Sequence, residues 1–188
     1  MKKLLVAICP LIAVSTFALD IDEAGAKVVF TAYKMQSKTA VPASFTSAKL
    51  TFAKTSGSVA EILTDATAQI DLNSVDTVKN PVRDKHVKEM LFANLASQES
   101  SGKITSVTGD DTKGELKATI KFNNVEQEIP MTYEVKDGKI VATGAISLEK
   151  DFGAKDAFEK FSSEKIIAGL HGGKTWEDVQ IGFEIPVK

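Results

Sequence analysis

Alternation of apolar and polar residues over positions 115–148 is the feature that most constrains the fold. It runs through 115–122, 125–135 and 140–148, interrupted once at Gln127. A period of two places the apolar side chains on one face of a strand and the polar ones on the other. Asn123-Asn124 and Asp137-Gly138, which separate these segments, suit two-residue hairpin turns. The pattern predicts a meander of three antiparallel strands.

Five further segments have strand character, and together with the meander they bring the expected number of strands to about eight. They are residues 28–33, 48–52, 66–72, 103–108 and 181–187. An antiparallel sheet of this size can close on itself around a single small ligand, and closure removes exposed edges. We therefore predict a mainly β protein, an eight-stranded antiparallel barrel. Pro186 indicates an edge or a strand end.

Two segments depart from alternation and are expected to be short helices. Asn80-Pro81 is a favourable helix start, because asparagine caps well and proline suits the first helical position. Apolar residues then follow helical spacing to Leu95. A second helix is predicted from Asp151 to Ala168, with Gly169 as its stop. No repeat or linker divides the chain, so we expect one domain over residues 19–188.

Residues 1–18 have the pattern of a secretory signal peptide. Two lysines precede an apolar run from Leu4 to Val14, and small residues follow it. The run is too short for a membrane-spanning helix, so no integral membrane span is expected. Cys9, the only cysteine, would leave with this peptide, and the mature domain could then use neither disulfides nor thiol chemistry. We expect a cleaved, exported protein located in the periplasm.

Charge and composition exclude several functions. A formal net charge of −2 offers no positive field for nucleic acid. Only two histidines exist, His86 and His171, and a zinc site normally needs three or four protein ligands. Asp110-Asp111 is interpreted as a solvated turn rather than a calcium loop. No metal, cofactor or catalytic residue is therefore predicted, and the protein is not expected to be an enzyme.

The most specific motif spans the end of one predicted strand and the start of the first helix. Its members are Ser74, Thr77, Arg83, Asp84, His86 and Phe92. This series resembles the YceI-like family, with Val87 where the family usually has leucine. Residues 120–125 and 170–176 are also similar to the family, although Asn124 stands where a glycine is frequent. The resemblance implies an exported, lipocalin-like barrel whose cavity binds a polyisoprenoid or another long amphiphile.

Arg83, Asp84 and His86 permit two readings. Residues two apart on a helix do not face each other, so Asp84 is poorly placed to orient His86 as a base. We favour a structural role in which Arg83 and Asp84 tie the helix start to the barrel through charge-assisted bonds. The alternative places Arg83 or His86 at the barrel mouth, against an anionic or amide ligand head.

The expected function is binding, transport or storage of a long-chain amphiphile such as a polyisoprenoid, fatty acid or fatty amide. The predicted ligand-binding residues are Phe30, Leu50, Phe52, Ile70, Leu116, Ile120, Ile129, Met131, Tyr133, Ile146 and Phe183. Predicted head-group or mouth contacts are Tyr33, Arg83, His86 and Trp176. Glycines 169, 172 and 173 could let the loop around His171 and Trp176 gate entry, but fixed packing is the favoured reading.

The sequence also leaves two alternative functions and the oligomeric state to be considered. A barrel with a filled core would act through its outer surface, as a non-enzymatic adhesin or inhibitor, and alternation cannot distinguish it from a carrier. A hydrolase of isoprenoid diphosphates would need a metal or an arginine cluster, and the sequence indicates neither. A homodimer is possible, but no apolar stripe requires one.

Overall fold

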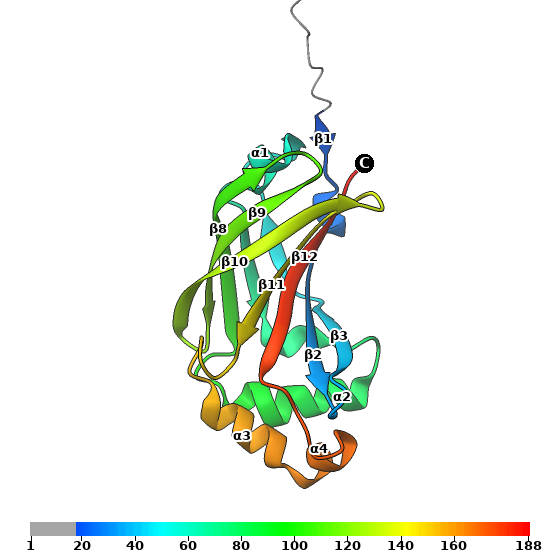
Figure 1. The fold of residues 1–188 in the computed structure, drawn as a ribbon, viewed down its shortest axis with the longest axis vertical. Coiled ribbons are helices and arrows are strands. Elements are labelled where there is room, and N and C mark those ends of the chain that lie inside the picture. The colour runs from blue at the N-terminus through cyan, green and yellow to red at the C-terminus, as the bar shows by residue number, and fades with distance from the viewer. Residues whose placement is uncertain (1–17) are drawn as a thin grey trace, which may run out of the picture.

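The computed structural model describes residues 18–188. The predicted signal peptide, Cys9 included, therefore lies outside the described residues except for Ala18. A ten-stranded antiparallel sheet forms most of the molecule, in the order β4-β6-β8-β9-β10-β11-β12-β2-β3-β7, and it curls into a half-barrel (Figure 1). Its strands are β2 Lys27–Lys34, β3 Thr39–Phe45, β4 Lys49–Thr51, β6 Thr67–Asp71, β7 Val75–Asp76, β8 Glu99–Gly109, β9 Lys113–Phe122, β10 Val125–Lys136, β11 Lys139–Ser147 and β12 Asp178–Pro186. The short strands β1 Leu19–Asp20 and β5 Ser56–Gly57 pair separately.

The predicted eight-stranded closed barrel is wrong in strand number and in closure. The sheet also contains β3 and the two-residue β7, and its end strands β4 and β7 do not pair with each other. Strand β3 was not foreseen because Pro42 stands at its centre, where proline removes a ladder donor. After β3 the chain stays close to β7, because the Thr46 amide donates to the carbonyl of Ser74, the residue before β7, at 3.0 Å.

The predicted meander is confirmed. Phe122 pairs with Val125 and Lys136 with Lys139, so both hairpins have two-residue turns. Asn123 and Asn124 have φ of 52° and 63°, the left-handed conformation that asparagine tolerates. Pro186, predicted at an edge or strand end, is the last residue of β12.

The first predicted helix forms at one end of the half-barrel. Helix α2 (Pro81–His86) continues through a π turn over Val87–Leu91 and a 3-10 turn over Phe92–Asn94. Asn80 caps it as predicted, because its Oδ1 accepts from the Arg83 amide at 3.1 Å.

The second predicted helix is shorter and divided. It forms as α3 (Lys155–Ser163) and α4 (Lys165–Leu170), separated by Glu164 in a non-helical conformation. Gly153, with φ of 59°, belongs to the turn before α3, so the helix cannot begin at Asp151. The short 3-10 turns Glu23–Gly25 and Leu72–Ser74 were not foreseen.

Helix α1 (Val59–Leu63), also unforeseen, closes the end of the half-barrel opposite α2, α3 and α4 (Figure 1). A reciprocal capping box between Ser58 and Glu61 begins it. Val59, Ile62 and Leu63 are completely buried, and this end is a packed core. In residues 18–188 we find no helix with the length and apolarity needed to cross a bilayer.

Candidate functional site

A cavity of about 670 Å³ occupies the interior of the half-barrel. Its wall consists mainly of apolar side chains from β2, β3, β6, β8, β9 and β12, and the helical segments at residues 80–92 and 158–170 cover one end. The volume lies within the range of about 300–1,000 Å³ typical of small-molecule sites. The sheet therefore encloses space rather than a fully packed core.

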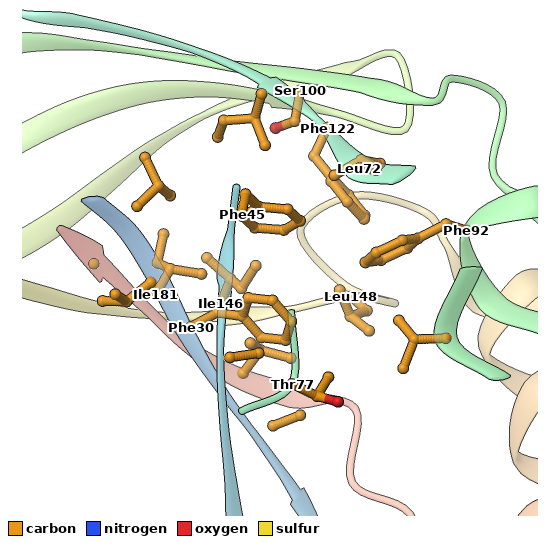
Figure 2. Close-up of a pocket in the computed structure, with 18 of the residues that line it drawn as sticks. Phe30, Phe45, Leu72, Thr77, Phe92, Ser100, Phe122, Ile146, Leu148 and Ile181 are labelled. Carbon is orange, nitrogen blue, oxygen red and sulfur yellow. The ribbon is translucent and has the colours of Figure 1, made fainter. Parts of the chain in front are cut away.

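Aromatic side chains form a row along one wall. The ring centroids of Phe30 and Phe45 lie 5.2 Å apart, and those of Phe45 and Phe92 lie 6.4 Å apart. Figure 2 shows these rings beside the hollow, with Ile146 and Leu148 nearby. Because β2, β3 and the 3-10 turn after α2 each contribute one ring, the row joins the sheet to the helical covering.

Eight of the eleven predicted ligand-binding residues line this cavity. They are Phe30, Leu50, Phe52, Ile70, Ile120, Met131, Ile146 and Phe183. All four predicted mouth contacts, Tyr33, Arg83, His86 and Trp176, also line it. For the eight predicted ligand-binding residues, period-two alternation along the strands is sufficient to identify the inner face.

The other three, Leu116, Ile129 and Tyr133, are buried but are not part of the cavity wall. Tyr133 lies close to the turn joining β8 and β9, where its hydroxyl donates to the Asp110 carbonyl at 2.8 Å. Burial, followed by the charges of Asp110 and Asp111, raises the pKa of Tyr133. Alternation identifies the inner face of a strand, but it does not show which part of that face is packed.

Several wall residues were missed by the sequence-based choice of site. They include Phe45, Leu72, Phe122, Leu148 and Ile181 (Figure 2). Val41, Ala43 and Phe45 do alternate along β3 and all line the cavity, so this segment carried a usable signal. Pro42 obscured that signal.

We infer from two exposed wall residues, one on α2 and one on α4, where the cavity opens to solvent. Val82 and Leu170, which line it, are 63 % and 53 % exposed. A wall residue with half its surface in water marks an opening. We call this opening, bordered by Val82, Leu170 and Trp176, the cavity mouth.

Arg83, on α2, is the only arginine in the chain and lines the mainly apolar cavity. Its Nε is buried and has no hydrogen-bond partner within the described chain. Buried polar groups in proteins are nearly always hydrogen-bonded, so an unpartnered guanidinium nitrogen at a cavity wall indicates a place for a ligand acceptor.

Asp84 ties the start of α2 to the barrel, the structural role that we expected of both Arg83 and Asp84. Its Oδ1 accepts from the Thr77 amide at 2.7 Å and from the Thr77 hydroxyl at 2.5 Å. Thr77 is one of the few buried polar residues, and it precedes α2. These bonds fix the start of the helix and thereby the position of the Arg83 backbone.

The loop at His171–Trp176 is held by specific contacts. The Met35 amide donates to the Lys174 carbonyl at 2.8 Å, and Trp176 Nε1 donates to the Met35 carbonyl at 2.8 Å. His171 Nδ1 lies 2.7 Å from the Thr175 hydroxyl. Burial, and then the charge of Lys34, lowers the pKa of His171. These contacts agree with fixed packing rather than a gate.

Residues 18–188 contain no group of three or more histidine, cysteine, aspartate or glutamate side chains arranged to hold a metal ion. The two histidines lie on different elements, His86 on α2 and His171 directly after α4. The cavity wall thus offers apolar surface, the guanidinium of Arg83, the ammonium groups of Lys34 and Lys103, and hydrogen-bonding side chains such as Thr77 and Ser100.

Fold and cavity together define the class of curled antiparallel-sheet proteins that enclose an apolar cavity. Within that class, the chain belongs to the YceI-like domain family, which matches residues 19–187. The family predicted from the sequence is thereby confirmed. No curated protein matches the chain.

Solved structures with the same fold extend over most of the chain. A polyisoprenoid-binding domain from Saccharophagus degradans, implicated in plant cell wall breakdown, is 16% identical with a TM-score of 0.58, covering 91% of this chain and 97% of its own. BcnA of Burkholderia cenocepacia is 17% identical with a TM-score of 0.55, covering 88% and 98%. A YceI protein of Campylobacter jejuni is 20% identical with a TM-score of 0.52, covering 80% and 86%. At these identities the likeness establishes the fold.

Proposed function

We propose that this protein is a non-enzymatic carrier that holds the hydrocarbon tail of one long-chain amphiphile inside the half-barrel. The observation that supports this most strongly is the cavity of about 670 Å³ with its apolar wall. A surface-acting barrel would have a filled interior, so the hollow favours the carrier over that alternative. The name of the Saccharophagus degradans domain is consistent with an isoprenoid ligand.

The hydrophobic effect would supply most of the affinity. Each methylene removed from water contributes about 0.8 kcal/mol. This gain must exceed the cost of ordering the chain and immobilising the ligand, so only long tails would bind tightly. Selectivity among tails would depend on length and shape, because the wall offers few polar groups to read identity.

Arg83 would bind the head group. Its partnerless Nε lies near the cavity mouth, on the same helix as His86. A carboxylate or phosphate oxygen is the natural partner of a guanidinium, and a neutral carbonyl oxygen could also accept from it. Fatty acids, fatty amides and isoprenoids with a polar head therefore all fit this arrangement.

The proposal includes export to the periplasm, which depends on the signal-like pattern of residues 1–18. It includes no chemical step. Asp84, the carboxylate nearest to His86 in sequence, directs Oδ1 to Thr77 and is occupied by a structural contact.

Native mass spectrometry of gently purified protein, followed by organic extraction, tests this function. We expect a bound mass that disappears on denaturation and is recovered in the extract as an amphiphile. Protein that shows only its own mass, and that does not displace a fluorescent fatty acid after delipidation, would contradict the carrier role.

A further inference from the structure

Within residues 18–188, five large apolar side chains are conspicuously exposed, and all lie at the helical end of the half-barrel. They are Met35, Val78, Val82, Ile166 and Leu170, between 37% and 65% exposed. Val78 lies just before α2, Val82 lies on α2, and Ile166 and Leu170 lie on α4. Both helices lie at the end opposite α1, where β2 also ends (Figure 1). Isolated exposed apolar residues are common, but the presence of all five at one end of the molecule indicates an interaction surface there.

Positive charge accompanies this apolar surface. Residues 34–38, 78–88 and 165–176 contain eight lysine or arginine residues and one acidic residue, Asp84. The three segments thus carry +7 in a chain whose net charge is −2, which leaves −9 elsewhere. Lys79, Lys85 and Lys165 are exposed beside the apolar side chains.

The neighbouring acidic residues only partly offset this charge. Asp76 accepts from the Lys79 amide, and Asp178 forms an ion pair with Lys38. Glu89 and Glu164 are the exposed carboxylates at the border of the three segments. Glu177, half-buried, also borders the third segment, and α3, at the same end, adds no net charge because Lys155 and Lys160 balance Asp156 and Glu159. The three segments are therefore more basic than the rest of the molecule.

Val78 is held in an unusual backbone conformation. Its φ is 60° and that of Lys79 is 56°, a left-handed region that strongly disfavours a β-branched residue. Contacts on both sides hold this turn, because Asp76 bonds to the Lys79 amide and Asp84 to Thr77. The fold thus presents an apolar side chain to solvent from a strained position, an arrangement that occurs mostly at functional sites.

We propose that the helical end docks on the surface of an anionic lipid bilayer with the cavity mouth facing the lipids. Exposed apolar side chains would enter the interface, and the lysines would contact anionic head groups. The same orientation would bring the opening between Val82 and Leu170 directly to the membrane, so that an amphiphile could move between bilayer and cavity without crossing water. The negatively charged remainder of the molecule would face away.

Vesicle flotation tests this proposal with two compositions, phosphatidylcholine alone and phosphatidylcholine with phosphatidylglycerol. We expect binding only to the anionic vesicles, weakening by about tenfold or more as sodium chloride is raised from low salt to about 0.5 M. Equal binding to both compositions, or to neither, would overturn the proposal; in the latter case the apolar surface would be a candidate for a protein partner.

Matched variants locate the surface. Lys79→Gln with Lys165→Gln should weaken anionic-vesicle binding, whereas Lys27→Gln with Lys113→Gln, at the starts of β2 and β9, should leave it unchanged. If both double variants lost vesicle binding equally, the net charge of the protein, rather than the lysines at its helical end, would determine binding.

Val78→Asn with Ile166→Asn tests the apolar contribution. Neither residue lines the cavity, and asparagine tolerates the backbone at position 78, so folding and uptake of a fluorescent fatty acid should persist. Reduced vesicle binding with normal fatty-acid uptake would support docking separately from the carrier function. Unchanged vesicle binding would overturn the role of these side chains.

Discussion

Arg83 distinguishes this cavity from a purely apolar tube. Its neighbours on the wall are mostly hydrocarbon, and its Nε has no partner within the described chain. A buried guanidinium nitrogen without a partner is costly, and that cost is recovered when a ligand oxygen accepts from it. The residue would therefore lower stability in the empty protein and favour one kind of head group in the loaded one.

Replacing Arg83 with Met should change head-group selectivity more than tail affinity. The wild-type protein should bind a fatty acid about tenfold or more tighter than the fatty alcohol of the same length, because a hydrogen bond to a charged group contributes about 1.5–3 kcal/mol. The variant should bind the two about equally. Calorimetric titration of both ligands measures this, and an unchanged acid preference in Arg83→Met would contradict the assigned role.

Gly102 offers a way to fill the cavity without disturbing the packing. It lies on the cavity wall in β8, and a Cβ built there would have no atom within 4 Å. Gly102→Val should retain or raise stability, since glycine weakens a strand, while reducing fatty-acid uptake. The exposed neighbour Gln69→Val is the control and should bind normally. Full uptake in Gly102→Val would show that the tail lies elsewhere.

The folded protein should lose stability in mild acid through His171. Because its pKa is lowered from 6.5, the unfolded chain takes up the proton first, and the free energy of unfolding falls as pH drops below about 6.5 until the folded-state pKa is passed. His171→Asn keeps a hydrogen-bonding group near Thr175 but cannot titrate. Urea unfolding near pH 7.5 and near pH 5.5 should show that the free energy of unfolding falls more between these pH values in the wild type than in His171→Asn. Equal losses would contradict this assignment.

Among the elements, strands with strict alternation were predictable and elements defined by tertiary contacts were not. The meander and its hairpins followed from local pattern and turn chemistry. Strand β3 did not, because its register depends on pairing with β2 and β7 despite Pro42. Helix α1 and the break at Glu164 involve too few residues for a helical period to be recognised.

The candidate site was likewise only partly predictable from the sequence. Alternation identified residues that face inward, such as Ile120 and Met131, and both line the cavity. It could not separate them from Leu116 or Tyr133, which also face inward but lie in the packed part of the interior. Sequence reasoning placed Arg83 at the start of the helix, but only the three-dimensional arrangement shows that its Nε lacks a partner.

Helix α2 depends on its cap at Asn80. Asn80→Ala removes the acceptor for the Arg83 amide and should reduce the free energy of unfolding by about 1 kcal/mol. Because the first turn of α2 carries Arg83, fatty-acid affinity should fall as well. Chemical denaturation of this variant beside Asn73→Ala, an exposed asparagine in the 3-10 turn before β7, measures the effect. Equal stability of the two variants would contradict the capping contribution.

The whole molecule combines a packed end and a hollow end. Val59, Ile62 and Leu63 of α1 are completely buried and contribute to a packed core, whereas helical segments that include α2 and α4 cover the cavity. A hollow forgoes van der Waals contacts that a filled core would make. A bound tail restores them, so ligand should raise the stability of the entire fold in proportion to its affinity and concentration.

Affinity as a function of tail length tests the central claim most directly. Saturated fatty acids of about 8 to about 18 carbons, titrated into delipidated protein, should bind roughly tenfold more tightly for every two added methylenes. The gain should stop when the cavity of about 670 Å³ is full. Dissociation constants that do not depend on tail length would contradict a hydrocarbon-binding interior.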